Sequence, residues 1–298
     1  MKNCKLIACL LVFALAFMVA ATAQDAPPPL TFTFKKFNVP GATATNSGGI
    51  NNKGVLVGQY TDKGLVGHGF ILNGTKLTKL DDPKGTSGST GASNLALNGP
   101  IAVVGTYVSK TTGNSVGFLY KGGKFTDVPG PKGALASTSN AINDHGDIVG
   151  QYADASGNLH AYVLSGGKYT TVDPPGSTSP AGNGINNAGD MVIVSGSNPN
   201  FSAFLYTAKT KKYKAINVPG YSGSFVTDIN TEGDVTYQGI DSAGNSHGVL
   251  RHLGKFYKFS VPKAALTYFG AANDHNMIVG GYASTARSNI QGLLVTWK

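Results

Sequence analysis

Short apolar and aromatic runs alternate along the chain with clusters of glycine, asparagine and proline. The runs are 4–8 residues long and rich in Val, Ile, Tyr and Phe. Runs of this length, bounded by turn-forming residues, are typical of β-strands joined by hairpins. Beyond the amino-terminal apolar segment, no stretch repeats its apolar positions with the period of an amphipathic helix. The pattern therefore predicts an all-β protein.

The runs recur as six copies of one unit. Each copy contains an asparagine preceded by an apolar residue, and these asparagines are spaced 47, 45, 43, 44 and 43 residues apart: Asn51, Asn98, Asn143, Asn186, Asn230 and Asn273. A run such as IVGQY follows, then one such as HAYVL, and a third run ends at a proline in five of the copies. Four strands in a period of about 40–45 residues are the repeat of a β-propeller blade.

The recurrent asparagine precedes a tight turn. Asparagine side chains cap turns by accepting hydrogen bonds from nearby backbone amides, so we expect a structural role for all six rather than a ring of ligands. The position three residues later is occupied by residues that tolerate positive φ, and we expect a left-handed conformation there. These residues are Gly54, Gly146, Gly189, Gly233 and Asn276.

The two ends of the chain predict how the array closes. The sixth copy stops at Val295–Lys298, where its last strand should begin. The segment FTFKKFNVPG, Phe32–Gly41, precedes the first copy and resembles that missing strand; its KKFNVPG compares with KKYKAINVPG at Lys211. We therefore expect a six-bladed β-propeller of four-stranded antiparallel blades over residues 32–298, closed by an amino-terminal strand that completes the last blade. Closure of this kind leaves no long open sheet edge.

The first 23 residues have the features of a secretory signal peptide. Lys2 and Lys5 precede an apolar run over residues 6–20, and small residues end at Ala23, where we expect cleavage. Residues 24–31 are a short linker, and no later segment is apolar enough for a transmembrane helix. The sequence thus predicts a secreted protein, extracellular or periplasmic.

Composition narrows the chemistry. Both cysteines, Cys4 and Cys9, fall in the signal, so the mature chain has no disulfide. The formal net charge is +9, carried mostly by scattered lysines. This charge suits solubility or weak attraction to acidic glycans. A nucleic-acid platform would need clustered arginines and aromatics. No nucleotide or zinc motif is present, and we expect no cofactor and no metal.

The repeat resembles the HAF-repeat family of bacterial extracellular proteins. The best copies are AINDHGDIVGQY from Ala141, with HAY from His160, and GINNKGVLVGQY from Gly49, with HGF from His68. The likeness covers about residues 32–298, although the second, fourth and sixth copies lack the histidine. The resemblance implies an extracellular repeat protein and supplies no reaction, ligand or catalytic set.

Three histidines recur at one position of the unit, in the first, third and fifth copies: His68, His160 and His247. Equivalent positions in alternate blades lie far apart around a ring, because four strands about 4.8 Å apart build each blade. They cannot readily share a metal, so hydrogen-bonded structural histidines are the favoured interpretation. No catalytic residue stands out, and Glu232 is the only glutamate.

The loops that enter the fifth and sixth blades carry the candidate ligand-binding residues: Tyr221, Phe225, Tyr268 and Phe269. Aromatic side chains there could stack on sugars or anchor a peptide, with packing between blades as the competing interpretation. The leading hypothesis is a monomeric, non-enzymatic binding module for a glycan or protein. The alternatives are an extracellular hydrolase or lyase that acts on polysaccharide through dispersed Asp and His residues, and a purely structural surface protein.

Overall fold

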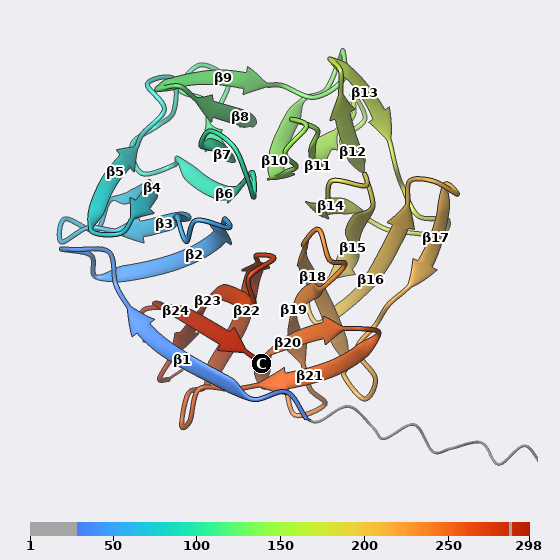
Figure 1. Cartoon of the computed structure of the whole chain (residues 1–298). Coiled ribbons are helices and arrows are strands. Elements are labelled where there is room, and N and C mark those ends of the chain that lie inside the picture. Colours follow the sequence, from blue (N-terminus) through green and yellow to red (C-terminus); the bar gives the residue numbers. More distant parts are fainter. Residues whose placement is uncertain (1–28, 286–287) are drawn as a thin grey trace, which may run out of the picture.

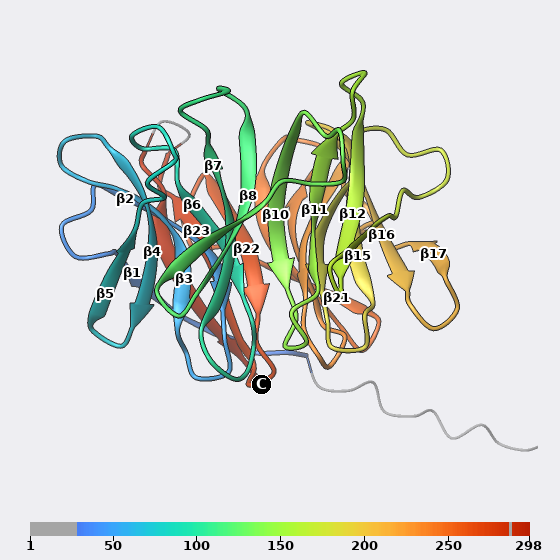
Figure 2. The ribbon, with the colours of Figure 1, turned by 90° about the horizontal axis from the view of Figure 1, so that it is seen from above.

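The computed structural model describes residues 29–285 and 288–298. The expected signal peptide and most of the expected linker lie outside these ranges. The described residues form 24 strands and no helix. They therefore contain no helix long and apolar enough to cross a membrane. The strands are grouped as sheets around a common centre (Figure 1), and inner strands such as β10 and β22 run roughly along the axis (Figure 2).

Four of the sheets are four-stranded, antiparallel and built from consecutive strands. The first contains β2 (Ala44–Ile50), β3 (Leu56–Thr61), β4 (Gly67–Asn73) and β5 (Lys76–Leu80). The second contains β6 (Gly91–Leu95), β7 (Ala102–Val108), β8 (Ser115–Lys121) and β9 (Lys124–Val128). The third contains β10 (Ala136–Ile142), β11 (Ile148–Ala153), β12 (Leu159–Ser165) and β13 (Lys168–Thr171). The fourth contains β14 (Ala181–Ile185), β15 (Met191–Ser197), β16 (Asn200–Thr207) and β17 (Lys212–Ala215).

The remaining eight strands form one mixed sheet. One half contains β18 (Gly223–Ile229), β19 (Val235–Ile240), β20 (Ser246–His252) and β21 (Lys255–Phe259). The other contains β22 (Leu266–Ala272), β23 (Met277–Ala283), β24 (Gln291–Trp297) and β1 (Phe32–Phe37). A single parallel pair, Ser246 with Leu266, joins the halves.

The amino-terminal strand β1 lies beside the carboxy-terminal strand β24 (Figure 1). The two pair antiparallel from Phe32 opposite Trp297 to Phe37 opposite Gly292. Backbone hydrogen bonds between Thr31 and Lys298, at 3.0 and 3.2 Å, extend this pairing by one residue. The segment expected to supply the missing strand therefore pairs with the last strand of the chain.

The hydrophobic core lies between neighbouring sheets. One cluster, for example, joins Ala102 and Val104 of the second sheet to Ile142 and Tyr162 of the third. The glycine of the recurrent Val-Gly-x-Tyr run leaves room for the aromatic ring and the inner strand of its own sheet. At Gly150, a Cβ would lie 1.9 Å from the Thr138 carbonyl oxygen and 3.0 Å from the Tyr162 ring. A side chain there would push the aromatic ring and the inner strand apart.

The recurrent asparagines cap the turns after the innermost strands, as expected. Oδ1 of Asn143, for example, accepts hydrogen bonds from the amides of His145 (3.1 Å) and Asp147 (2.9 Å). The left-handed position is confirmed at Gly146, where φ is +87°, and at Asn276, where φ is +57°. The same side chains also reach the next sheet. Nδ2 of Asn143 donates to the Asn186 carbonyl at 3.2 Å, and Nδ2 of Asn273 donates to the Asn51 carbonyl at 2.9 Å.

The assignment of Asn98 to this series is wrong. The turn of the second sheet closes with a hydrogen bond from Ala96 to Ala102, whereas that of the first closes from Asn51 to Val55. The buried position in the second sheet is therefore Ala96, and Asn98 is exposed. A longer turn, Asn-Gly-Pro, displaces the asparagine by two residues.

Asn98 belongs instead to an outer ring of polar residues just beyond the capping asparagines. Its Nδ2 donates to Asp144 Oδ2 at 2.9 Å, and Nδ2 of Asn187 donates to the same oxygen at 2.7 Å. Nδ2 of Asn52 contacts Asn98 Oδ1 at 3.1 Å and Asp274 Oδ2 at 2.9 Å. Polar side chains thus link successive sheets around this end of the axis.

Candidate functional site: an axial cavity

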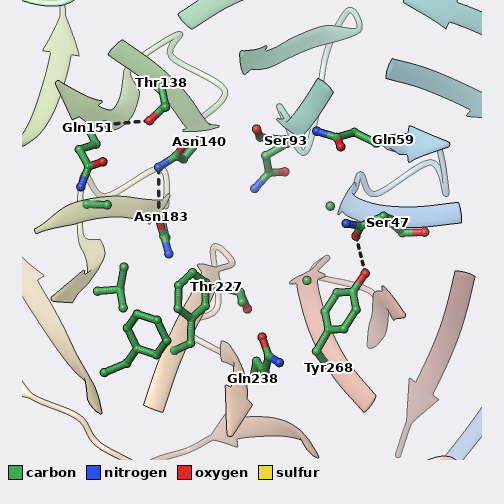
Figure 3. Close-up of a pocket in the computed structure, with 18 of the residues that line it drawn as sticks. Ser47, Gln59, Ser93, Thr138, Asn140, Gln151, Asn183, Thr227, Gln238 and Tyr268 are labelled. Atoms are coloured by element: carbon green, nitrogen blue, oxygen red, sulfur yellow. Dashed lines mark hydrogen bonds between the residues drawn. The ribbon is translucent and has the colours of Figure 1, made fainter. Parts of the chain in front are cut away.

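A cavity of about 730 Å³ occupies the centre of the ring. Its lining comes from the innermost strands β2, β6, β10, β14, β18 and β22 and from parts of the strands that follow them. Because every sheet contributes, the site exists only in the assembled ring. Figure 3 shows the labelled side chains arranged around this space. The volume lies within the range of about 300–1,000 Å³ that is usual for small-molecule sites.

Each innermost strand carries a β-bulge at the same place, and each bulge residue lines the cavity. A bulge inserts one extra residue into a strand and redirects its side chain. The six bulge residues are Gly48, Ser93, Asn140, Asn183, Thr227 and Gly270. The bulges therefore turn a ring of small and polar side chains towards the axis.

Amides hold the bulge residues of neighbouring sheets together. Nδ2 of Asn140 lies 3.1 Å from the Gly182 carbonyl and 3.2 Å from Asn183 Oδ1. Asn183 in turn donates to the Val226 carbonyl at 2.8 Å. These bonds fix the positions of the amides before any ligand binds, which lowers the entropic cost of binding.

A second set of amides comes from the second strand of alternate sheets: Gln59 on β3, Gln151 on β11 and Gln238 on β19. Gln151 Nε2 donates to the carbonyls of Ser179 (3.3 Å) and Pro180 (3.0 Å), and Gln238 Nε2 donates to Ser246 Oγ at 2.9 Å. Gln59 is the exposed member of the three. Its amide is the one most available to a ligand.

Aromatic rings supply the apolar part of the lining. Phe201 and Phe225 meet edge to face, with centroids 4.9 Å apart. Tyr268 lies against Gly281, where a Cβ would come 2.6 Å from the ring, and its hydroxyl donates to Asn46 Oδ1. Burial raises the pKa of Tyr268, so the phenol stays neutral and remains a donor.

The cavity lining combines apolar surface with uncharged polar groups. Among the residues that the structure describes, its lining includes no Asp, Glu, Lys, Arg or His. A buried carboxyl group, that of Asp228, lies beside the lining residue Asn94. Gly184 makes room for this carboxyl, since a Cβ there would lie 2.7 Å from Asp228 Oδ1. Burial raises the pKa of Asp228 to about 8, which keeps it mostly protonated at neutral pH.

The four aromatic residues singled out from the sequence have different environments. Phe225 and Tyr268 line the cavity, but from strands β18 and β22 rather than from loops. Tyr221 lies in the loop and packs edge to face on His247, away from the cavity lining. Phe269 is wholly buried and stacks on Phe259 at 5.7 Å. Because successive strand residues face opposite sides, Tyr268 and Phe269 cannot both face the cavity.

Sequence reasoning missed the glutamines and the bulge residues. The recurrent Gly-Gln-Tyr of the first and third copies was a visible signal for Gln59 and Gln151, because a polar residue recurs inside an otherwise apolar strand. The bulges left no such signal. A one-residue insertion in a short strand reverses the facing of the residues that follow it.

The three recurrent histidines lie in three different sheets, on β4, β12 and β20, and each is held by hydrogen bonds. Nδ1 of His68 lies 2.8 Å from Asp81, and Nδ1 of His160 lies 2.7 Å from Asp173. Asp173 raises the pKa of His160 through this bond. These hydrogen bonds agree with the structural interpretation of the three histidines, because each bond ties a loop to a strand.

Comparison with known proteins supports the fold. No protein-family model matches the chain, and a comparison with curated protein sequences finds no significant match. Among solved structures, a TolB-like protein from Agrobacterium tumefaciens has a TM-score of 0.55 at 12% identity, covering 90% of this chain and 99% of that one. TolB from Acinetobacter baumannii has a TM-score of 0.51 at 11% identity, over 87% of this chain and 64% of that one.

A third similar structure is AofleA from Arthrobotrys oligospora. It has a TM-score of 0.51 at 11% identity and covers 91% of this chain and 88% of that one. The chain thus spans about two thirds of the Acinetobacter protein and most of the other two. At this identity the likeness concerns the fold alone, which is an all-β, propeller-like arrangement of antiparallel sheets.

Proposed function

We propose that this protein is a secreted binding module that takes a neutral glycan into the axial cavity. The observation that carries the proposal is the composition of the lining. Amide and hydroxyl groups surround the space, aromatic rings form part of its wall, and charged side chains are absent from the described lining. Sugars present hydroxyls to such amides and flat apolar faces to such rings.

The same composition argues against the other ligand classes. A phosphate, a nucleotide or an acidic sugar would require cationic donors, since burying an unpaired charge is costly. A peptide would have no charged partner here for its ends or side chains. A neutral, hydroxyl-rich ligand matches the available donors and acceptors and leaves no charge buried.

The alternative of a hydrolase or lyase finds less support in the cavity. Glycoside hydrolysis uses a pair of carboxyl groups, one on each side of the scissile bond. The described axial lining includes no carboxyl group, and the carboxyl of Asp228 beside it is buried and mostly protonated at neutral pH. We therefore favour binding without turnover.

The proposal includes an architecture. We infer six blades closed by β1, counting β18–β21 and β22–β24 with β1 as separate blades. The single residue pair that joins these two groups supports the separation. Membership of the HAF-repeat family and secretion after cleavage near Ala23 belong to the same proposal. Amino-terminal sequencing of the exported protein should begin at Gln24.

The proposed function is tested by binding of the purified mature chain to a panel of neutral, acidic and amino sugars, followed by calorimetry. We expect saturable binding of a neutral glycan, with one axial site per chain and no product formed. Ser93→Phe, which fills the cavity from β6, should abolish this binding, and Ser156→Phe, in an exposed loop outside the lining, should not. Equal binding by both variants would rule out the axial site.

A further inference from the structure

A second cavity, of about 650 Å³, lies between the third and fourth sheets. One wall comes from residues 157–160, where β12 begins, and the other from residues 173–180, which connect β13 to β14. Leu159 and Ser179 line both this cavity and the axial one. The two spaces are therefore adjacent lobes that meet at this pair of residues, which we call the axial lobe and the rim lobe.

The partition between the lobes is held in place by a residue of the axial lobe. Gln151 donates from Nε2 to the carbonyls of Ser179 and Pro180, at 3.3 and 3.0 Å. Ser179 itself has a φ of +50°, which turns the connecting segment sharply at the junction. Leu159, on the other side, is 38% exposed, a large apolar side chain on the path between the lobes. The junction is thus preformed and partly apolar.

The rim lobe continues the chemistry of the axial lobe. Asn158 and Ser177 offer an amide and a hydroxyl, and Pro174 and Pro175 offer apolar ring faces. The two titratable residues of its lining, His160 and Asp173, are hydrogen-bonded to each other at 2.7 Å. The lobe therefore adds donors, acceptors and apolar patches, with the carboxylate already engaged.

We propose that the glycan is an oligosaccharide whose chain runs from the axial lobe over Leu159 into the rim lobe. This inference rests on the proposed function and specifies its ligand. A single sugar unit could occupy one lobe only, whereas an extended chain of hydroxyl-bearing rings matches two polar lobes joined by an apolar step. Binding in both lobes by one molecule requires no further loss of translational freedom, so affinity rises with chain length.

The test uses neutral oligosaccharide ladders of one to six units from the malto, cello, manno and N-acetylchito series. For the series that binds, we expect the affinity of the wild-type protein to rise by about tenfold or more from one unit to the longer chains. Ser177→Trp should remove this gain and leave the affinity for the single unit unchanged. Thr178→Trp, the neighbouring exposed position outside both linings, should keep the wild-type dependence on length.

Pro175→Trp, on the exposed wall of the rim lobe, repeats the test in case Ser177→Trp does not fold. Equal affinity for short and long chains, or a length gain that survives both rim substitutions, overturns the inference and leaves glycan binding in the axial lobe intact. Failure of every ladder to bind contradicts the proposed function itself, and with it this extension.

Discussion

The two ends of the axis use the same residue types in opposite ways. Just beyond the innermost strands, asparagine amides are consumed by the protein, capping turns and linking successive sheets. Along those strands, bulge residues line a cavity together with glutamines of the adjoining strands, and Gln59 is exposed to it. A recurrent polar residue becomes structural where a neighbouring backbone group bonds it, as at Asn143 and also at Asn140. It stays available for binding where it faces the cavity and remains exposed, as at Gln59.

The comparison presumes a ring that closes on itself, and deletion of residues 31–41 should break it. The deletion removes β1 and the buried Val39, and with β1 the Phe32 contacts to Phe259 and Phe269. Losing such a strand should cost more than about 5 kcal/mol, a large part of typical domain stability. We expect loss of cooperative unfolding, or a fall in Tm of more than about 10 °C, by calorimetry. A truncated chain that melts like the full one would disprove closure by β1.

At the end of the axis where asparagines cap the turns, Asn273→Ala should be strongly destabilising. Asn273 is fully buried; its Oδ1 accepts two backbone amides at 3.0 Å, and its Nδ2 donates to the first sheet at 2.9 Å. Each buried group left without its hydrogen-bond partner costs about 1–3 kcal/mol. We therefore expect the free energy of unfolding in urea to fall by about 3 kcal/mol or more.

Asn98→Ala is the matched control, because it removes an exposed amide at the same end. We expect a change within about 0.5 kcal/mol. Similar losses in the two variants would mean that the capping asparagines do not carry the link between the sheets.

The carboxyl of Asp228 lies beside the cavity, and it should make the stability of the protein depend on pH. Because burial raises its pKa in the folded protein to about 8, the folded state binds a proton more strongly than the unfolded state does. Stability is therefore fully present below the ordinary carboxyl pKa of about 4 and is lost as pH rises through about 8. Asp228→Asn, which keeps the size and polarity of the side chain without a charge, should be more stable than the wild type by about 2 kcal/mol at pH 9.

The measurement is a series of denaturant titrations of both proteins between pH 4 and pH 9. The advantage of the variant should vanish near pH 4. A difference between the two proteins that does not depend on pH would contradict the assignment of the titration to Asp228.

The comparison also explains which features the sequence could predict. Strand runs, the left-handed turn at Gly146 and the capping by Asn143 follow from local chemistry, so they are readable from each copy alone. The cavity is a property of the assembled sheets. Phe269 shows the limit: as an aromatic residue on an expected loop into the sixth blade it was a candidate ligand contact, yet it lies in β22 and its side chain is buried. Only the register across β22 and β23, with its bulge, decides which of two adjacent aromatics reaches the cavity.

In the axial cavity, Gln59→Ala should leave the fold unchanged and weaken binding. Gln59 is exposed to the cavity, so its loss should change the free energy of unfolding by no more than about 0.5 kcal/mol. If its amide bonds a sugar hydroxyl, the dissociation constant should rise by about three- to tenfold, as for the loss of a neutral hydrogen bond. Calorimetric titration with the glycan that binds the wild type measures this, with Asn98→Ala as the control. The opposite pattern, in which Asn98 affects binding and Gln59 does not, would place the ligand at the other end of the axis, because the two amides differ chiefly in which end they face.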